Sequence, residues 1–223
     1  VMVPSWRGEN DNPGQYEMFY GEVSDLVAAV GYASERSYVD PDRIYLAGHS
    51  TGGTLALLAA ESTSLPRAVF SFGGAPDLEP LFAGGSEAYG NTPFDPEREG
   101  ELRYRSADEW IERLQVPTYY FEGETTSYPI WAERLEEVAA ESGVSFHSYI
   151  VDGGTHFNTL DPLADRLASL LVKDTGGRVE LGLSQAVVQR VFDEATDHET
   201  PYEPRDGNFF ARNCRERDEG SRC

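Results

Sequence analysis

Residues 42–54 read Asp-Arg-Ile-Tyr-Leu-Ala-Gly-His-Ser-Thr-Gly-Gly-Thr, a short apolar run that breaks at a glycine. The pattern Gly-x-Ser-x-Gly between a strand and a helix predicts a nucleophile elbow, with Ser50 as the attacking group of a serine hydrolase. A serine on so sharp a turn has a strained backbone, so we expect Gly48 and Gly52 to be needed because they lack side chains. We expect the free N–H of Thr51, at the start of the helix, to donate to an oxyanion.

The flanking sequence supports the elbow, because the bare motif is weak evidence in a chain with 22 glycines. Strand-forming residues 44–46 precede it, and the apolar segment 54–61 predicts a buried helix after it. Dinucleotide and phosphate loops fit less well, since the chain lacks Gly-x-Gly-x-x-Gly and a lysine after the glycines. The remaining alternative is a tight strand-to-helix turn with an incidental serine.

Strand-like and helix-like segments alternate along the chain, which predicts an α/β fold with a mostly parallel sheet and helices on both faces. The predicted strands cover residues 2–4, 43–47, 67–72, 116–122 and 144–151. The predicted helices lie around residues 19–30, 54–61, 131–139, 163–172 and 184–195.

The domain organisation follows from this alternation. We expect one catalytic domain over residues 1–182, and a C-terminal helix and charged tail over residues 183–223. Residues 78–113 break the rhythm and are rich in Gly, Pro, Glu and Arg. An insertion after a strand of an open α/β sheet overhangs the ligand crevice, so this segment is predicted to be a lid or cap, with a plain surface loop as the alternative.

Charge limits the partners of this 223-residue chain, which carries 39 acidic and 18 basic residues and a net charge of −21. The acid excess argues against nucleic acid or an anionic membrane as partner, because phosphate contacts need basic patches. No apolar run is long enough to span a membrane. We therefore expect a soluble, cytoplasmic protein that takes a peptide or small ester substrate; the sequence does not indicate its oligomeric state.

Cysteine and histidine spacing gives no sign of a metal or cofactor. Cys214 and Cys223 both lie in the polar C-terminal tail, where they cannot staple the fold and form either a local disulfide or free thiols. The four histidines are scattered, without His-Glu-x-x-His or Cys-x-x-Cys spacing. We expect neither a structural nor a catalytic metal, and no cofactor.

A serine nucleophile needs a base within hydrogen-bond reach. In an elbow fold the histidine follows the last strand, and His156 lies there, after Gly153 and Gly154. The weaker candidates are His49, beside the serine, His147, inside the last strand, and His198, in the tail. His156 is the predicted general base.

The carboxylate that would orient His156 is left open by the sequence. The usual position, a few residues past the glycine after the strand at 116–122, holds threonine, and Glu124 is the nearest carboxylate. Asp77, after the preceding strand, is an equal alternative, and Asp152 ranks below both.

These motifs together resemble the catalytic domain of prolyl oligopeptidase-type serine peptidases of the α/β-hydrolase superfamily. The resembling segments are residues 4–8, 39–44, 48–53, 117–123 and 154–157, within residues 1–175. The resemblance implies Ser50 as nucleophile and His156 as base in a mechanism with an acyl-enzyme intermediate. It implies serine-type peptidase activity ahead of carboxylesterase activity.

Two departures from the family pattern qualify that expectation. The usual acid position carries no Asp, and no His-Gly-Gly-type oxyanion loop precedes Met2. The strands begin at what would be the fourth of the usual eight, so we expect either a shortened sheet or a piece of a longer protein. The alternative function is a non-catalytic or impaired hydrolase-fold module that acts in binding.

Overall fold

A parallel four-stranded sheet forms the centre of the computed structural model, which describes residues 1–82, 92–126, 129–175, 179 and 181–196. Within this part of the chain the strand order is β1-β2-β3-β4, the order of the sequence. The strands are β1 (Tyr45–His49), β2 (Ala68–Phe72), β3 (Thr118–Gly123) and β4 (Phe146–Val151). Because all four run the same way, their carboxyl ends meet at one edge of the sheet.

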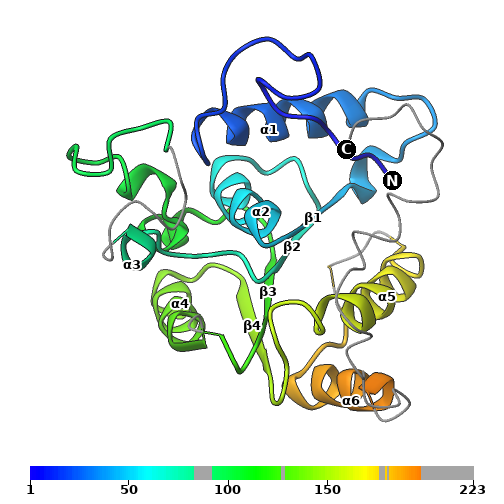
Figure 1. The fold of residues 1–223 in the computed structure, drawn as a ribbon. Helices are drawn as coiled ribbons and strands as arrows, with labels where there is room; N and C mark the ends of the chain where they lie inside the picture. The colour runs from blue at the N-terminus through cyan, green and yellow to red at the C-terminus, as the bar shows by residue number, and fades with distance from the viewer. Residues whose placement is uncertain (83–91, 127–128, 176–178, 180, 197–223) are drawn as a thin grey trace, which may run out of the picture.

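Helices cover both faces of the sheet (Figure 1). One core layer lies between the sheet and α1 (Gly21–Ser34), α2 (Thr51–Ser62) and α4 (Pro129–Ser142). The other lies between the sheet and α5 (Leu160–Leu171) and α6 (Gln185–Thr196). Short helical turns complete the described elements: α3 (Glu79–Phe82) and the 3-10 turns Pro41–Arg43, Arg103–Arg105, Ala107–Glu109 and Ile111–Arg113.

Aromatic side chains tie neighbouring strands together on the α5/α6 face. Phe72 stacks on Phe121 with ring centroids 4.9 Å apart, and Phe121 stacks on Tyr149 at 5.3 Å. Residues two apart along a strand share a face, so Tyr120 and Glu122 point to the opposite side from Phe121. The register thereby directs Glu122 toward the α2/α4 layer.

The predicted fold class is confirmed, and each predicted helix has a counterpart. One predicted strand is wrong: residues 2–4 form no strand in the described structure. A strand needs a neighbouring edge to satisfy its backbone groups. Val1, Met2 and Pro4 instead line a hollow of about 430 Å³ together with side chains of α1 and β1.

The insertion over residues 78–113 and the C-terminal tail are described only in part. Residues 83–91 of the insertion lie outside the described residues, so its role as a lid stays a prediction. His198, Cys214 and Cys223 lie outside them as well.

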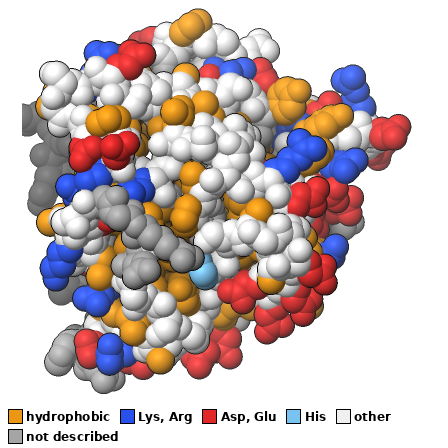
Figure 2. All heavy atoms as spheres, turned by 180° about the vertical axis from the view of Figure 1, so that it is seen from behind, with side chains coloured by type: hydrophobic (Ala, Val, Ile, Leu, Met, Phe, Trp, Pro, Cys, Tyr) orange, Lys and Arg blue, Asp and Glu red, His pale blue; other side chains and the backbone are white. Residues whose placement is uncertain are grey.

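No helix in the described part of the chain has the length and apolar character needed to cross a membrane. On the face in Figure 2, acidic side chains gather toward the lower right margin.

The junction between β1 and α2 is a sharp turn at Ser50. Ser50 has φ 55° and ψ −117°, a conformation that L-residues adopt at a cost of about 1–3 kcal/mol. Its amide donates to the Phe72 carbonyl at 2.8 Å, which joins the turn to the end of β2. At Gly48 a β-carbon would lie 2.0 Å from the Gly52 carbonyl oxygen. The turn therefore excludes any side chain at position 48.

Gly52 does not meet the expectation drawn from the motif. A β-carbon built there has no heavy atom within 4 Å, whereas one at Gly53 would lie 2.8 Å from the Gly74 amide nitrogen. Close packing therefore leaves no room for a side chain at Gly48, the first glycine of the motif, or at Gly53, which follows its second glycine. The role of Gly52 in the turn comes from its backbone, because the Gly52 carbonyl is the group that Gly48 approaches.

Two carboxyl groups, one buried and one half-buried, lie between α2 and the turn at Ala107–Glu109. Glu61 is 8% exposed, and its Oε1 has no hydrogen-bond partner among the described residues. Burial, followed by the charge of Asp108, raises the pKa of Glu61 well above its usual value. Burial and the nearby charges of Asp77 and Glu109 raise the pKa of Asp108 to about 7, against a smaller opposing effect of Arg134. Both carboxyls therefore favour the neutral form in the folded protein.

The glycine contacts predict opposite outcomes for two matched substitutions. Gly48→Ala should destabilise the protein by about 1–3 kcal/mol or more, because the new methyl group must displace backbone atoms. Gly52→Ala should leave stability unchanged or raise it, since position 52 is helical and open. Chemical denaturation of both variants measures the difference; equal loss of stability in the two would contradict the steric argument.

The buried carboxyls predict that stability falls as pH rises. A carboxyl whose pKa is raised on folding contributes stability that is complete below its unfolded pKa and is lost as pH rises through the folded pKa. Glu61→Gln removes this loss, so at pH 8 its free energy of unfolding should exceed that of wild type by about 1 kcal/mol or more. At pH 4 the two should be similar. The exposed Glu137→Gln is the control, and an advantage of Glu61→Gln that does not depend on pH would contradict the assignment.

Candidate active site

Two of the predicted catalytic residues, Ser50 and His156, lie at the carboxyl edge of the sheet. Ser50 follows β1 and His156 lies in the loop after β4, while Glu122, which was not predicted, is the last residue but one of β3. Gly73, directly after β2, lies between them: a β-carbon there would be 2.7 Å from the His156 ring and 3.0 Å from Glu122 Oε2. The topology of a parallel sheet thus brings together residues that are far apart in the sequence.

The Ser50 hydroxyl does not cap the helix that follows it. The residue is the N-cap of α2, yet its side chain makes no capping hydrogen bond. Thr54 N donates to the Ser50 carbonyl at 3.0 Å, so the backbone begins the helix while the hydroxyl remains available. Thr51 is the first residue of α2, where the amide has no partner within the helix. A reacting carbonyl at Ser50 would lie beside that N–H.

His156 is half-buried against the ends of β2 and β3. Its side chain is 24% exposed, and its Nδ1 lies 3.5 Å from Glu122 Oε2. An ionised carboxylate only accepts hydrogen bonds, so in this contact Nδ1 carries the proton and Nε2 is left as an acceptor. Among the described residues no hydrogen bond joins Ser50 Oγ to the His156 ring. Catalytic hydrogen bonds often tighten only when substrate binds.

Glu122 is the carboxylate that the structure brings to His156. Its side chain is fully buried, and the Gly123 amide donates to its Oε1 at 2.8 Å. Burial raises the pKa of Glu122, while the Gly123 N–H, the charge of His156 and that of His49 act in the opposite direction. Partners on both oxygens are what a buried carboxylate requires.

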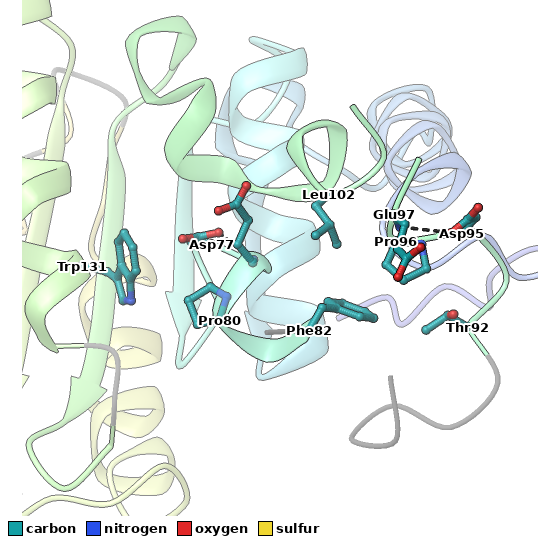
Figure 3. A pocket seen from close by; sticks show the side chains of 10 residues that line it. Asp77, Pro80, Phe82, Thr92, Asp95, Pro96, Glu97, Leu102 and Trp131 are labelled. Atoms are coloured by element: carbon teal, nitrogen blue, oxygen red, sulfur yellow. Dashed lines mark hydrogen bonds between the residues drawn. The ribbon is translucent and has the colours of Figure 1, made fainter. Parts of the chain in front are cut away.

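The carboxylates favoured by the sequence lie elsewhere. Glu124 Oε2 accepts from the Gly153 amide at 2.9 Å, so it holds the turn before His156 and does not contact the ring. Asp77 Oδ1 accepts from the Glu79 amide at 2.8 Å. Figure 3 shows Asp77 among the side chains that line a pocket of about 1000 Å³, together with Trp131 from α4. Asp152 is exposed, and its backbone pairs with the side chain of Gln189.

Sequence reasoning did not consider Glu122, because this residue precedes the glycine instead of following it. The sequence does hold a signal: Glu122 is the charged residue in the apolar run Tyr-Tyr-Phe-Glu-Gly, residues 119–123. A carboxylate inside a buried strand is rare unless it is paired. Such a residue at the end of a strand is therefore a candidate partner for a histidine at the same edge.

The other histidines fall into distinct places. His49 lies beside Ser50, with its Nε2 2.8 Å from the His156 carbonyl oxygen. His147 lies on β4, where its ring stacks on Tyr119. Within the described residues no group of three or more His, Cys, Asp or Glu side chains could hold a metal ion.

Known proteins with the same fold are peptidases and hydrolases. Puromycin hydrolase is 22% identical and matches with a TM-score of 0.59, over 72% of this chain and 27% of that one. Dipeptidyl peptidase 4 of Porphyromonas gingivalis is 21% identical, with a TM-score of 0.58, over 69% of this chain and 22% of that one. Acylaminoacyl peptidase of Pyrococcus horikoshii is 14% identical, with a TM-score of 0.54, over 75% and 30%. At these identities the match establishes the α/β-hydrolase fold.

Comparisons by sequence match less of the chain than the comparisons of structures do. No curated protein matches the chain. The chain spans less than a third of the length of the solved structures named above. The model of the prolyl oligopeptidase family, Peptidase_S9, matches residues 7–115, from the Arg-Gly segment through the elbow to the residues before β3. Residues 7–115, just under half of the chain, therefore match the prolyl oligopeptidase family.

Proposed function

We propose that this chain is a serine hydrolase that cleaves a peptide or ester bond through an acyl-enzyme on Ser50. The observation that carries the proposal is the elbow itself, in which an uncapped serine hydroxyl sits on a strained turn beside a helix N-terminus. The family match favours a peptide over an ester as substrate.

The proposed reaction uses three side chains and one amide. Ser50 Oγ attacks the substrate carbonyl carbon while His156 Nε2 takes the hydroxyl proton. The Thr51 N–H stabilises the negative charge on the carbonyl oxygen. The C–N or C–O bond then breaks, and His156 returns the proton to the leaving amine or alcohol. Water, activated by His156, attacks the acyl-enzyme and releases the acid.

Glu122 is proposed as the group that supports the imidazolium. Support comes from its contact with Nδ1, which leaves Nε2 as the nitrogen that can accept the proton of Ser50. Its raised pKa means that the carboxyl must first ionise to take this role. We therefore expect the reaction to weaken as pH falls through the pKa of Glu122.

Labelling with a fluorophosphonate probe tests the proposal. Wild type should be labelled, Ser50→Ala should not, and His156→Ala should react at least about a hundredfold more slowly. Absence of labelling in a folded wild-type chain would contradict the proposal and favour a non-catalytic module that acts in binding.

Matched amide substitutions in the same assay place the acid. Glu122→Gln should slow labelling by about two to four orders of magnitude, since the base loses its charged partner. Gln can still accept from the Gly123 amide, so thermal stability should not fall. Glu124→Gln and Asp77→Asn should label within about threefold of wild type, because neither carboxylate contacts His156 and a glutamine at position 124 can still accept from the Gly153 amide. Unchanged labelling of Glu122→Gln would exclude this acid.

A further inference from the structure

The contact between His156 and Glu122 does not by itself hold the ring of the proposed base in one position. At 3.5 Å it is longer than a normal hydrogen bond of about 2.9 Å. His156 lies in a loop with few ties to the sheet, so its place relative to Ser50 depends on what holds that loop. A misplacement of about 1 Å is enough to cost roughly a hundredfold in rate.

The loop is held at two places by different strands. From the end of β3, Glu124 accepts from the Gly153 amide at 2.9 Å, and Thr125 donates from its hydroxyl to the Gly154 carbonyl at 2.8 Å. These bonds anchor the start of the loop. The backbone of His156 has its anchor at the elbow, where its carbonyl lies 2.8 Å from His49 Nε2.

We infer that His49 is a positioning residue that ties the loop of the base to the nucleophile elbow. A carbonyl oxygen only accepts, so His49 Nε2 carries the proton in this bond. Because His49 is the residue directly before Ser50, one side chain connects the backbone of the proposed base to that of the proposed nucleophile. The inference rests on the proposed function for its catalytic meaning, but the anchor itself is a structural statement.

Ring packing strengthens the same tie. The rings of His49 and His156 lie 4.8 Å apart between centroids, and Phe157 lies 5.7 Å from His49 and 5.0 Å from His156. Phe157 itself is 74% exposed. Without His49, the loop keeps its hydrogen bonds to Glu124 and Thr125 at Gly153 and Gly154, which lie two or more residues before the base.

Two variants separate the hydrogen bond from the ring. His49→Phe keeps an aromatic ring but loses the N–H donor, and His49→Gln keeps a donor but loses the ring. His147→Phe is the matched control, because His147 lies on β4 and stacks on Tyr119 away from the elbow. Each is labelled with the fluorophosphonate probe at several concentrations, which separates the limiting rate from the half-saturating concentration.

The expected result is a lower limiting rate with unchanged probe binding. His49→Phe should lose about ten- to a hundredfold in limiting rate, with the half-saturating concentration within about twofold of wild type. His49→Gln should recover a large part of that loss, and His147→Phe should match wild type. A limiting rate of His49→Phe equal to that of wild type would overturn the inference.

Hydrogen exchange of the amides of residues 154–160 gives a second readout that does not need activity. In His49→Phe these amides should exchange at least about tenfold faster than in wild type, while those of β3 stay unchanged. Unchanged exchange would overturn the inference. Faster exchange in a chain whose wild type is not labelled would support the anchor and count against the proposed function, so the two failures are distinguishable.

Discussion

The close approach of the Gly48 backbone to the Gly52 carbonyl is the constraint on which the active edge depends. That approach allows β1 to turn directly into α2, and the turn holds Ser50 at φ 55°. A serine in this conformation has its hydroxyl outside the helix and its neighbour Thr51 at the helix start. The strain is held by long-range bonds, chiefly from Ser50 N to the end of β2. The proposed nucleophile is therefore positioned by the sheet and the helix together.

The same edge explains how a carboxylate can work inside the core. Glu122 is fully buried, which opposes its ionisation, and only the Gly123 amide and the nearby histidines favour the charged form. Gly73 makes room for this pair, since a side chain there would occupy the place of the His156 ring. His49 then connects the loop of His156 to the elbow. The proposed site is thus one packed unit of four strand ends.

Much of this arrangement could be predicted from the sequence where the signal is local. The elbow and its flanking elements lie within one short continuous segment, Tyr45–Ser62, with strong propensities, so the strand, turn and helix were predictable. The position of His156 followed from chain order. Features that depend on pairing between distant segments were not accessible: residues 2–4 have strand-forming composition but pair with no strand of the described sheet. Glu122 was missed because its role depends on where β3 ends and which face it presents.

Steric roles of glycine also need three-dimensional information. The motif suggests that Gly48 and Gly52 are equivalent, but the helix carries position 52 toward open space and brings Gly53 against Gly74. Similarly, Glu124 is near His156 in space, yet its carboxylate binds the backbone of the turn. The position of Glu124 in the sequence predicts that it lies near His156, but its hydrogen bond to the Gly153 amide decides what the carboxylate does.

A structure of the chain after reaction with a fluorophosphonate probe is the decisive measurement on the proposed site. We expect phosphorus bonded to Ser50 Oγ, one phosphoryl oxygen accepting from the Thr51 amide, and His156 between Ser50 and Glu122. An adduct on another side chain would contradict this expectation. So would an adduct on Ser50 in which His156 has left Glu122 for a different carboxylate.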